Sequence, residues 1–157
     1  HARINVIDTT AALAVPGVVA VLTASDIRAH VVMDRLVVAL PDKTYRQQRD
    51  RPILADTETV YIGEAIALVL AEDPYLAEDA AGLVDIGYDP LPAAADCRDA
   101  LRDGAPTVHS DASDNLVAAF KSSYGDVDAA FSAAPHVVRE SFWTHRGCAH
   151  SLEGRGC

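Results

Sequence analysis

The sequence is poor in cysteine and in basic side chains, and each shortage excludes a class of protein. Three cysteines in 157 residues, Cys97, Cys148 and Cys157, are too few and too scattered for a disulfide framework. Free thiols favour a reducing compartment, so we expect a cytoplasmic protein. The chain has 13 Lys and Arg against 23 Asp and Glu, which gives a formal net charge of -10. Because that charge repels phosphate backbones, we expect no nucleic-acid partner.

Long apolar runs are also lacking. No run approaches the roughly 20 residues that a membrane-spanning helix needs, so we expect no membrane partner. Residues 1–5 have neither the charged leader nor the apolar stretch of a signal peptide. The chain begins on His1 without a methionine and ends on Cys157 within a motif-like segment. We therefore expect it to be a piece of a longer protein.

A length of 157 residues predicts one domain, or one compact domain with an appendage. Hydrophobic residues make up 50% of the chain and aromatic residues only 6%, which predicts an aliphatic core. The clearest structural signal is the stretch 60–92. Residues 65–71 form an apolar run of strand length. Asp73 and Pro74 then supply a helix cap and a first-turn proline. Apolar residues then recur at helical spacing and are expected to face inward: Tyr75, Leu76, Ala80, Leu83 and Val84. A second apolar segment, 83–88, completes a predicted strand, crossover helix and strand.

Apolar and turn-forming residues place further elements along the chain. Strands are expected at 4–7, 18–22, 117–124 and 136–144. Short helical segments are expected at 11–14, 23–27 and 97–102. A last helix should begin after Gly125-Asp126, with Val127, Ala130 and Phe131 facing inward.

Metal-ligating residue types gather near the end of the chain. The four residues are His145, Cys148, His150 and Cys157. Thiolate and imidazole are the ligands that zinc prefers. A zinc finger or ribbon has close pairs separated by a longer loop, and this spacing does not match that pattern. We favour an irregular segment over a zinc site.

Charged residues beside glycines give the other candidates. Glu153 and Arg155 flank Gly154 and could orient a ligand, but an ion pair at a domain junction is the favoured interpretation. Glu64 follows Gly63 before the apolar run, where a turn-stabilising role is the default. No nucleophile elbow, phosphate-binding loop or dinucleotide fingerprint is present in the sequence. Taken alone, these residues identify no activity.

Several stretches together resemble a known family. They are Ala2-Arg3-Ile4, residues 7–9, residues 12–27, residues 52–55, residues 61–67, residues 77–81, residues 88–93, residues 125–131, His145-Arg146 and residues 152–156. In this order they resemble the opening domain of the large subunit of the molybdenum hydroxylases. That family includes xanthine dehydrogenase, aldehyde oxidase and aerobic carbon monoxide dehydrogenase.

The resemblance implies an α+β fold, the α/β-hammerhead, in which short helices pack on a mixed β-sheet. It assigns residues 1–144 to this domain and residues 145–157 to the start of a junction with a molybdopterin-binding domain. The sequence departs from the family at three positions. The family often has proline at Ala65 and an acidic residue at Gly82, and Gly87 lies in an expected strand, where glycine weakens packing.

The resemblance also implies a function for the parent protein. It would hydroxylate aldehydes, purines or N-heterocycles, or oxidise carbon monoxide, at a molybdenum ion held by a pterin, with iron–sulfur clusters and FAD in partner subunits or domains. The piece itself should be structural and inactive alone, without catalytic, cofactor-binding or metal residues. Its domain-junction candidates are Gly63, Glu64, Glu153 and Arg155. The alternatives are a free-standing binding module and a small zinc protein that uses the terminal His/Cys cluster.

Overall fold

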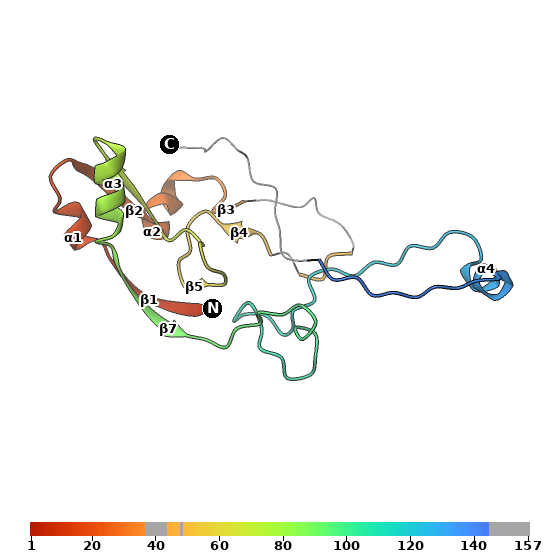
Figure 1. Ribbon diagram of the computed structural model, residues 1–157. Coiled ribbons are helices and arrows are strands. Elements are labelled where there is room, and N and C mark those ends of the chain that lie inside the picture. Colours follow the sequence, from red (N-terminus) through yellow and green to blue (C-terminus); the bar gives the residue numbers. More distant parts are fainter. Residues whose placement is uncertain (37–43, 48, 145–157) are drawn as a thin grey trace. The chain divides into compact units, whose positions relative to one another are not determined.

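The computed structural model describes residues 1–36, 44–47 and 49–144 (Figure 1). The chain divides into two compact units, His1–Phe120 and Lys121–Cys157. Most of the strands and helices belong to the first unit, and each unit is described by itself.

A three-stranded sheet is built around the N-terminal strand. Strand β1 (Ala2–Asp8) lies between β5 (Glu58–Thr59) and β7 (Asp85–Pro90), and it is antiparallel to both. The pairing of β1 with β7 is irregular between Ile4 and Val6, where a β-bulge shifts the register. Ile4 is buried and Val6 is largely exposed, so the bulge separates a core position of β1 from an exposed one.

Two further strand pairs complete the first unit. Strand β2 (Val18–Thr23) pairs antiparallel with β6 (Ala67–Ala71), and β3 (Arg35–Leu36) pairs antiparallel with β4 (Arg51–Pro52). Within the first pair Val21 lies opposite Val69. The β-branched residues of 18–22 account for the strand that the sequence predicts there.

Short helices cover the β2–β6 pair. Helix α1 (Thr10–Leu13) packs on β2, and α3 (Pro74–Ala81) packs on β6 and on α1 (Figure 1). Helix α2 (Ala24–Ile27) and the 3-10 helix η1 (Arg28–His30) follow β2 directly. The core between these elements is aliphatic, as expected. Its buried residues are Ile4, Ala12, Val21, Ala24, Leu54, Ala55 and Ala80.

The ends of α3 follow from its sequence. The Asp73 carboxylate accepts a hydrogen bond from the Leu76 N–H at 2.9 Å, and Pro74 occupies the first turn, as predicted. Gly82 is the C-cap, and its N–H donates to Glu78 O at 3.3 Å. The inner face is only partly as predicted, because Ala80 is buried and Tyr75 is largely exposed.

The structure changes the expected topology of the central unit. Strands β6 and β7 belong to different sheets, so α3 connects two sheets and does not cross over within one. Every strand pairing in the described ranges is antiparallel. The expected α+β class is nevertheless confirmed, since short helices pack on small antiparallel sheets.

The second unit contains α4 (Val127–Ala133). The Asp126 carboxylate accepts a hydrogen bond from the Ala129 N–H at 2.9 Å, so the helix begins where the sequence predicts. The inward orientation expected for Val127 and Phe131 is wrong, because both are exposed and no described residue of α4 is buried. The strand expected at 136–144 does not form.

Two other expected elements are also absent from the described residues. The segment 117–124 makes one isolated β-bridge, between Ala118 and Tyr45, and no strand. Residues 97–102 form turns and no helix, with the Ala100 N–H donating to Asp96 O at 3.1 Å. Without a neighbouring strand to accept their backbone hydrogen bonds, apolar residues alone do not make a strand.

Two smaller findings bear on the excluded protein classes. Among the helices of the described ranges, none combines the length and the apolar character needed to cross a membrane. Cys97, the cysteine that falls within these ranges, is an exposed free thiol.

Candidate functional site

The loop between β5 and β6 brings two of the predicted junction residues together. Gly63 has a φ of +92°, a conformation that L side chains rarely adopt. The Glu64 carboxylate turns back and accepts a hydrogen bond from the Val60 N–H at 2.7 Å. The turn-stabilising role suggested for Glu64 is therefore present in the geometry. It closes the 60–64 loop.

The closed 60–64 loop exposes apolar side chains at its tip. Ile62 is 103% exposed, and Tyr61 is 46% exposed. Exposed apolar side chains mark contact surfaces where they gather in a patch.

The remaining predicted site residues lie outside the described part of the chain. These residues are Glu153, Arg155 and the candidate zinc cluster of His145, Cys148, His150 and Cys157. The expected junction segment, 145–157, is likewise outside the described ranges.

A cavity of about 170 Å³ lies beside this loop. Its charged lining residues are Arg28, Asp34, Arg35, Asp56, Glu58, Glu64 and His109. Arg28 Nη2 lies 2.5 Å from Asp56 Oδ2, and Arg35 Nη1 donates to Asp50 O at 2.6 Å. Both members of the Arg28–Asp56 pair are substantially exposed, so the pair adds little to stability. The pair does place one positive and one negative charge side by side in the wall of the cavity.

The N-terminal end of α2 supports one side of this cavity. Ala24 and Ile27 of α2 line it. The hydroxyl and the N–H of Thr23 both donate to Asp26 Oδ2 at 2.7 Å, in the manner of a capping box. The Thr23 hydroxyl, followed by the Thr23 N–H, lowers the pKa of Asp26 below its ordinary value of 3.8.

Sequence reasoning missed Glu58 on β5, which three residues contact. His1 Nε2 lies 3.2 Å from Glu58 Oε2, and the Ser110 N–H donates to the same oxygen at 3.2 Å. His109 Nδ1 lies 3.7 Å from Glu58 Oε1. Glu58 and His109 are far apart in the sequence, and no local motif joins them. Only the folded chain brings them together.

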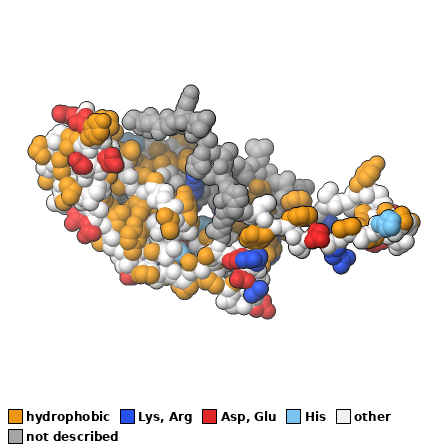
Figure 2. Space-filling model, in the orientation of Figure 1, with side chains coloured by type: hydrophobic (Ala, Val, Ile, Leu, Met, Phe, Trp, Pro, Cys, Tyr) orange, Lys and Arg blue, Asp and Glu red, His pale blue; other side chains and the backbone are white. Residues whose placement is uncertain are grey.

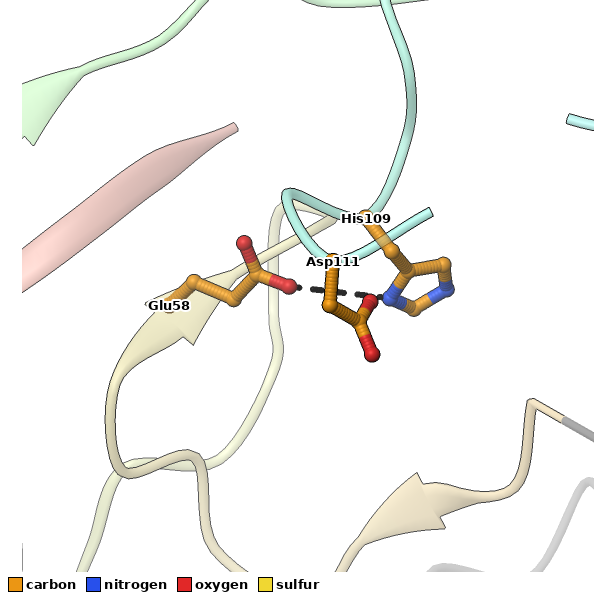
Figure 3. A group of neighbouring side chains, drawn as sticks. All are labelled: Glu58, His109 and Asp111. Carbon is orange, nitrogen blue, oxygen red and sulfur yellow. Dashed lines mark ion pairs between the residues drawn. The ribbon is translucent and has the colours of Figure 1, made fainter. Parts of the chain in front are cut away.

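Asp111 completes this group, which we call the Glu58 cluster: Glu58, His109 and Asp111 (Figure 3). One potential ligand atom from each residue lies within 4.8 Å of the other two. Figure 3 shows all three side chains directed toward the same space. Arg49 Nη1 also donates to Asp111 Oδ1 at 2.7 Å, which holds the Asp111 carboxylate in place.

Comparison with known proteins identifies the family. Residues 1–92 match the family described as "Aldehyde oxidase and xanthine dehydrogenase, a/b hammerhead domain". The chain belongs to this family. The match covers more than half of the hammerhead chain and includes β1 to β7, so the predicted resemblance to the molybdenum hydroxylases is confirmed. The domain boundary at residue 144 remains a prediction.

Relatives extend the likeness over nearly all of the hammerhead chain. The "6-hydroxypseudooxynicotine dehydrogenase complex subunit gamma" of Paenarthrobacter nicotinovorans is 38% identical over 159 residues, covering 99% of this chain and 19% of that protein. The "Nicotinate dehydrogenase large molybdopterin subunit" of Eubacterium barkeri is 34% identical over 146 residues, covering 93% of this chain and 31% of that protein. The chain thus spans less than a third of the length of either relative.

A solved structure supports the fold as well. Quinoline 2-oxidoreductase from Pseudomonas putida 86 is similar with a TM-score of 0.66 and 32% sequence identity. The similarity covers 74% of this chain and 14% of that one. The hammerhead fold and the oxidoreductase character of its relatives therefore rest on both sequence and structure.

Proposed function

We propose that the chain is the hammerhead portion of the large, molybdopterin-binding subunit of a molybdenum-containing oxidoreductase. Its own contribution is structural: it supplies surfaces that pack against the downstream molybdopterin-binding domains. The family match over residues 1–92 and the small share of each relative that the chain covers support this role.

The observation that carries the proposal is the apolar surface of the first unit. Hydrophobic side chains spread across the face of the molecule seen in Figure 2. Large exposed examples in the first unit include Val19, Val32, Met33, Ile62, Tyr75 and Leu101. The buried residues, by contrast, are mostly small. Apolar area left in water on a folded unit favours association with other protein surfaces, because burial removes about 25 cal/mol per Å² of unfavourable hydration.

The residues around the cavity do not fit a molybdenum–pterin cofactor. A cavity of about 170 Å³ is smaller than the roughly 300–1,000 Å³ typical of ligand pockets, and four carboxylates in its lining oppose an anionic pterin phosphate. We therefore assign no step of the reaction to these residues. The cofactor belongs to other domains of the subunit, with iron–sulfur clusters and FAD in partner subunits or domains of a cytoplasmic complex.

N-heterocycles are the substrate class we would test first. The names of three similar proteins refer to 6-hydroxypseudooxynicotine, nicotinate and quinoline, and these compounds share a nitrogen heterocycle. Aldehydes, purines and carbon monoxide are the other classes that the family resemblance implies.

The test is expression of the complete reading frame that contains residues 1–157, together with the neighbouring reading frames for partner subunits. We expect molybdenum and iron in the purified complex and oxidation of an N-heterocycle with a dye as electron acceptor. The same preparation from cells grown with tungstate in place of molybdate is the control. A reading frame that ends at Cys157, giving a stable monomer, would support the free-standing binding module and overturn the proposal.

A further inference from the structure

We propose that the Glu58 cluster is a binding site for one Zn²⁺ ion, separate from any molybdenum chemistry. The site would take one imidazole nitrogen from His109 and one carboxylate oxygen each from Glu58 and Asp111. This inference does not depend on the proposed function, since all three residues lie within the first unit.

The distance between His109 and Glu58 is the first reason. His109 Nδ1 and Glu58 Oε1 are 3.7 Å apart, which is too long for a hydrogen bond of about 2.7–3.2 Å. Two ligand atoms that each lie about 2.0–2.2 Å from a tetrahedral zinc ion are about 3.4 Å apart. The observed separation is therefore close to the spacing of two zinc ligands.

The donor set is the second reason. One imidazole and two carboxylates are ligands that zinc accepts, whereas Mg²⁺ and Ca²⁺ prefer sites made of oxygen alone. The ligand atoms lie within 4.8 Å of one another, so contraction onto one ion needs movements of about 1 Å. Asp111 is 73% exposed, and its position on the surface leaves the fourth coordination site open to water.

The surroundings hold the ligands in position. His1 lies against Glu58 Oε2, and the Ser110 N–H donates to both carboxylate oxygens, at 3.2 Å to Oε2 and 3.4 Å to Oε1, while Oε1 also faces His109. The His1 ring is also held by Pro92 O, which lies 3.1 Å from its Nδ1. This arrangement, in which outer groups orient a ligating carboxylate, is common around metal ions in proteins.

His1 lies 3.2 Å from Glu58 Oε2, and Arg49 is a second basic residue that contacts the cluster in the described residues. Arg49 binds Asp111 Oδ1, so Oδ2 is the oxygen that the ion would use. The two carboxylates of the cluster carry two negative charges, which Arg49 and, when protonated, His1 offset. A divalent cation would compete with Arg49 and His1 for these carboxylates.

The experiment is calorimetric titration of the 157-residue chain with zinc chloride near neutral pH, and measurement of its unfolding temperature with and without zinc. We expect one zinc ion per chain and a higher unfolding temperature when it is bound, because a ligand that binds only the folded state stabilises it. H109A and D111N should each weaken binding by roughly tenfold or more, since even the loss of an outer-shell partner costs 10–100-fold.

Two matched controls make the result specific. D103N removes one exposed carboxylate outside the cluster, and C148S disables the candidate terminal zinc site. Both should bind zinc like the unmodified chain. D111N changes an exposed side chain and keeps an oxygen for Arg49, so it tests binding without loss of folding. The proposal is overturned by an absence of stoichiometric zinc, by unchanged binding in folded H109A and D111N, or by loss of binding in C148S alone.

Discussion

Gly17 lies so close to Leu76 that a Cβ on the glycine would be 2.6 Å from Leu76 Cδ2. Its φ of +88° is also unfavourable for any residue with a side chain. The Glu72 N–H donates to Gly17 O at 2.9 Å. The turn before β2 therefore packs tightly against the start of α3. This contact helps to hold α3 on the β2–β6 pair.

Gly17→Ala should lower the free energy of unfolding by about 2–3 kcal/mol. A left-handed conformation costs an L residue about 1–2 kcal/mol, and the collision with the partly movable Leu76 adds about 1 kcal/mol. Urea unfolding monitored by circular dichroism measures the change.

Gly104→Ala is the control for that experiment. Gly104 has a φ of +78°, but no atom lies within 4 Å of its would-be Cβ. It should show only the backbone cost of about 1–2 kcal/mol. Equal losses in the two variants would mean that the contact with Leu76 contributes nothing.

Asp73→Ala should destabilise the first unit by about 1 kcal/mol, because the Leu76 N–H loses its acceptor at the start of α3. Thermal unfolding followed by calorimetry measures the loss. Asp79→Ala removes a carboxylate from the exposed side of the same helix and should be nearly neutral. If Asp79→Ala cost as much as Asp73→Ala, charge and not capping would explain the effect.

The contact between Thr23 and Asp26 predicts a dependence on pH. Its contribution to stability is present above the ordinary carboxyl pKa of 3.8, and it is lost as the pH falls below that value through the lower pKa of folded Asp26. An NMR titration of the Asp26 carboxyl carbon should give a midpoint below 3.8.

Two variants of Thr23 separate the causes of that shift. Thr23→Val removes the hydroxyl, which is the larger cause, and should move the pKa of Asp26 back toward its ordinary value. Thr23→Ser keeps both donors and should leave the pKa lowered. A midpoint that is the same in all three proteins would show that the hydroxyl does not act on Asp26.

The start of the central helix was predictable from sequence because it depends on neighbouring residues. Asp73 and Pro74 determine the start of α3 within a few positions of the chain. The glycines that depart from the family pattern needed the structure. Gly82 is the cap of α3 and not an interior residue. A Cβ on Gly87 would lie 2.8 Å from Val6 Cγ1, across the β-bulge.

Other features were not predictable from sequence, since they depend on partners that are remote along the chain. Glu58 meets His109 only after the first unit has folded, and neither residue lies in a recognisable motif. The apolar segments 117–124 and 136–144 have strand-like composition, but strand formation also needs a neighbour to pair with. Likewise, the sequence predicts where α4 begins but not that Phe131 remains exposed.

Ile62→Asp tests whether the tip of the 60–64 loop is a contact surface in the proposed large subunit. Ile62 is fully exposed, so the variant of the 157-residue chain should unfold at the same urea concentration as the unmodified chain. In the complete subunit, burial of this side chain against another domain would contribute about 1.5–3 kcal/mol, and a buried carboxylate would cost more.

We therefore expect the complete Ile62→Asp subunit to assemble about ten- to a hundredfold more weakly and to retain less molybdenum. Size-exclusion chromatography and metal analysis of the purified complex measure both effects. Val32→Asp, which changes another fully exposed aliphatic residue on a different loop, shows whether the effect belongs to the 60–64 loop. Normal assembly and full molybdenum content in Ile62→Asp would show that this loop faces solvent in the complex as well.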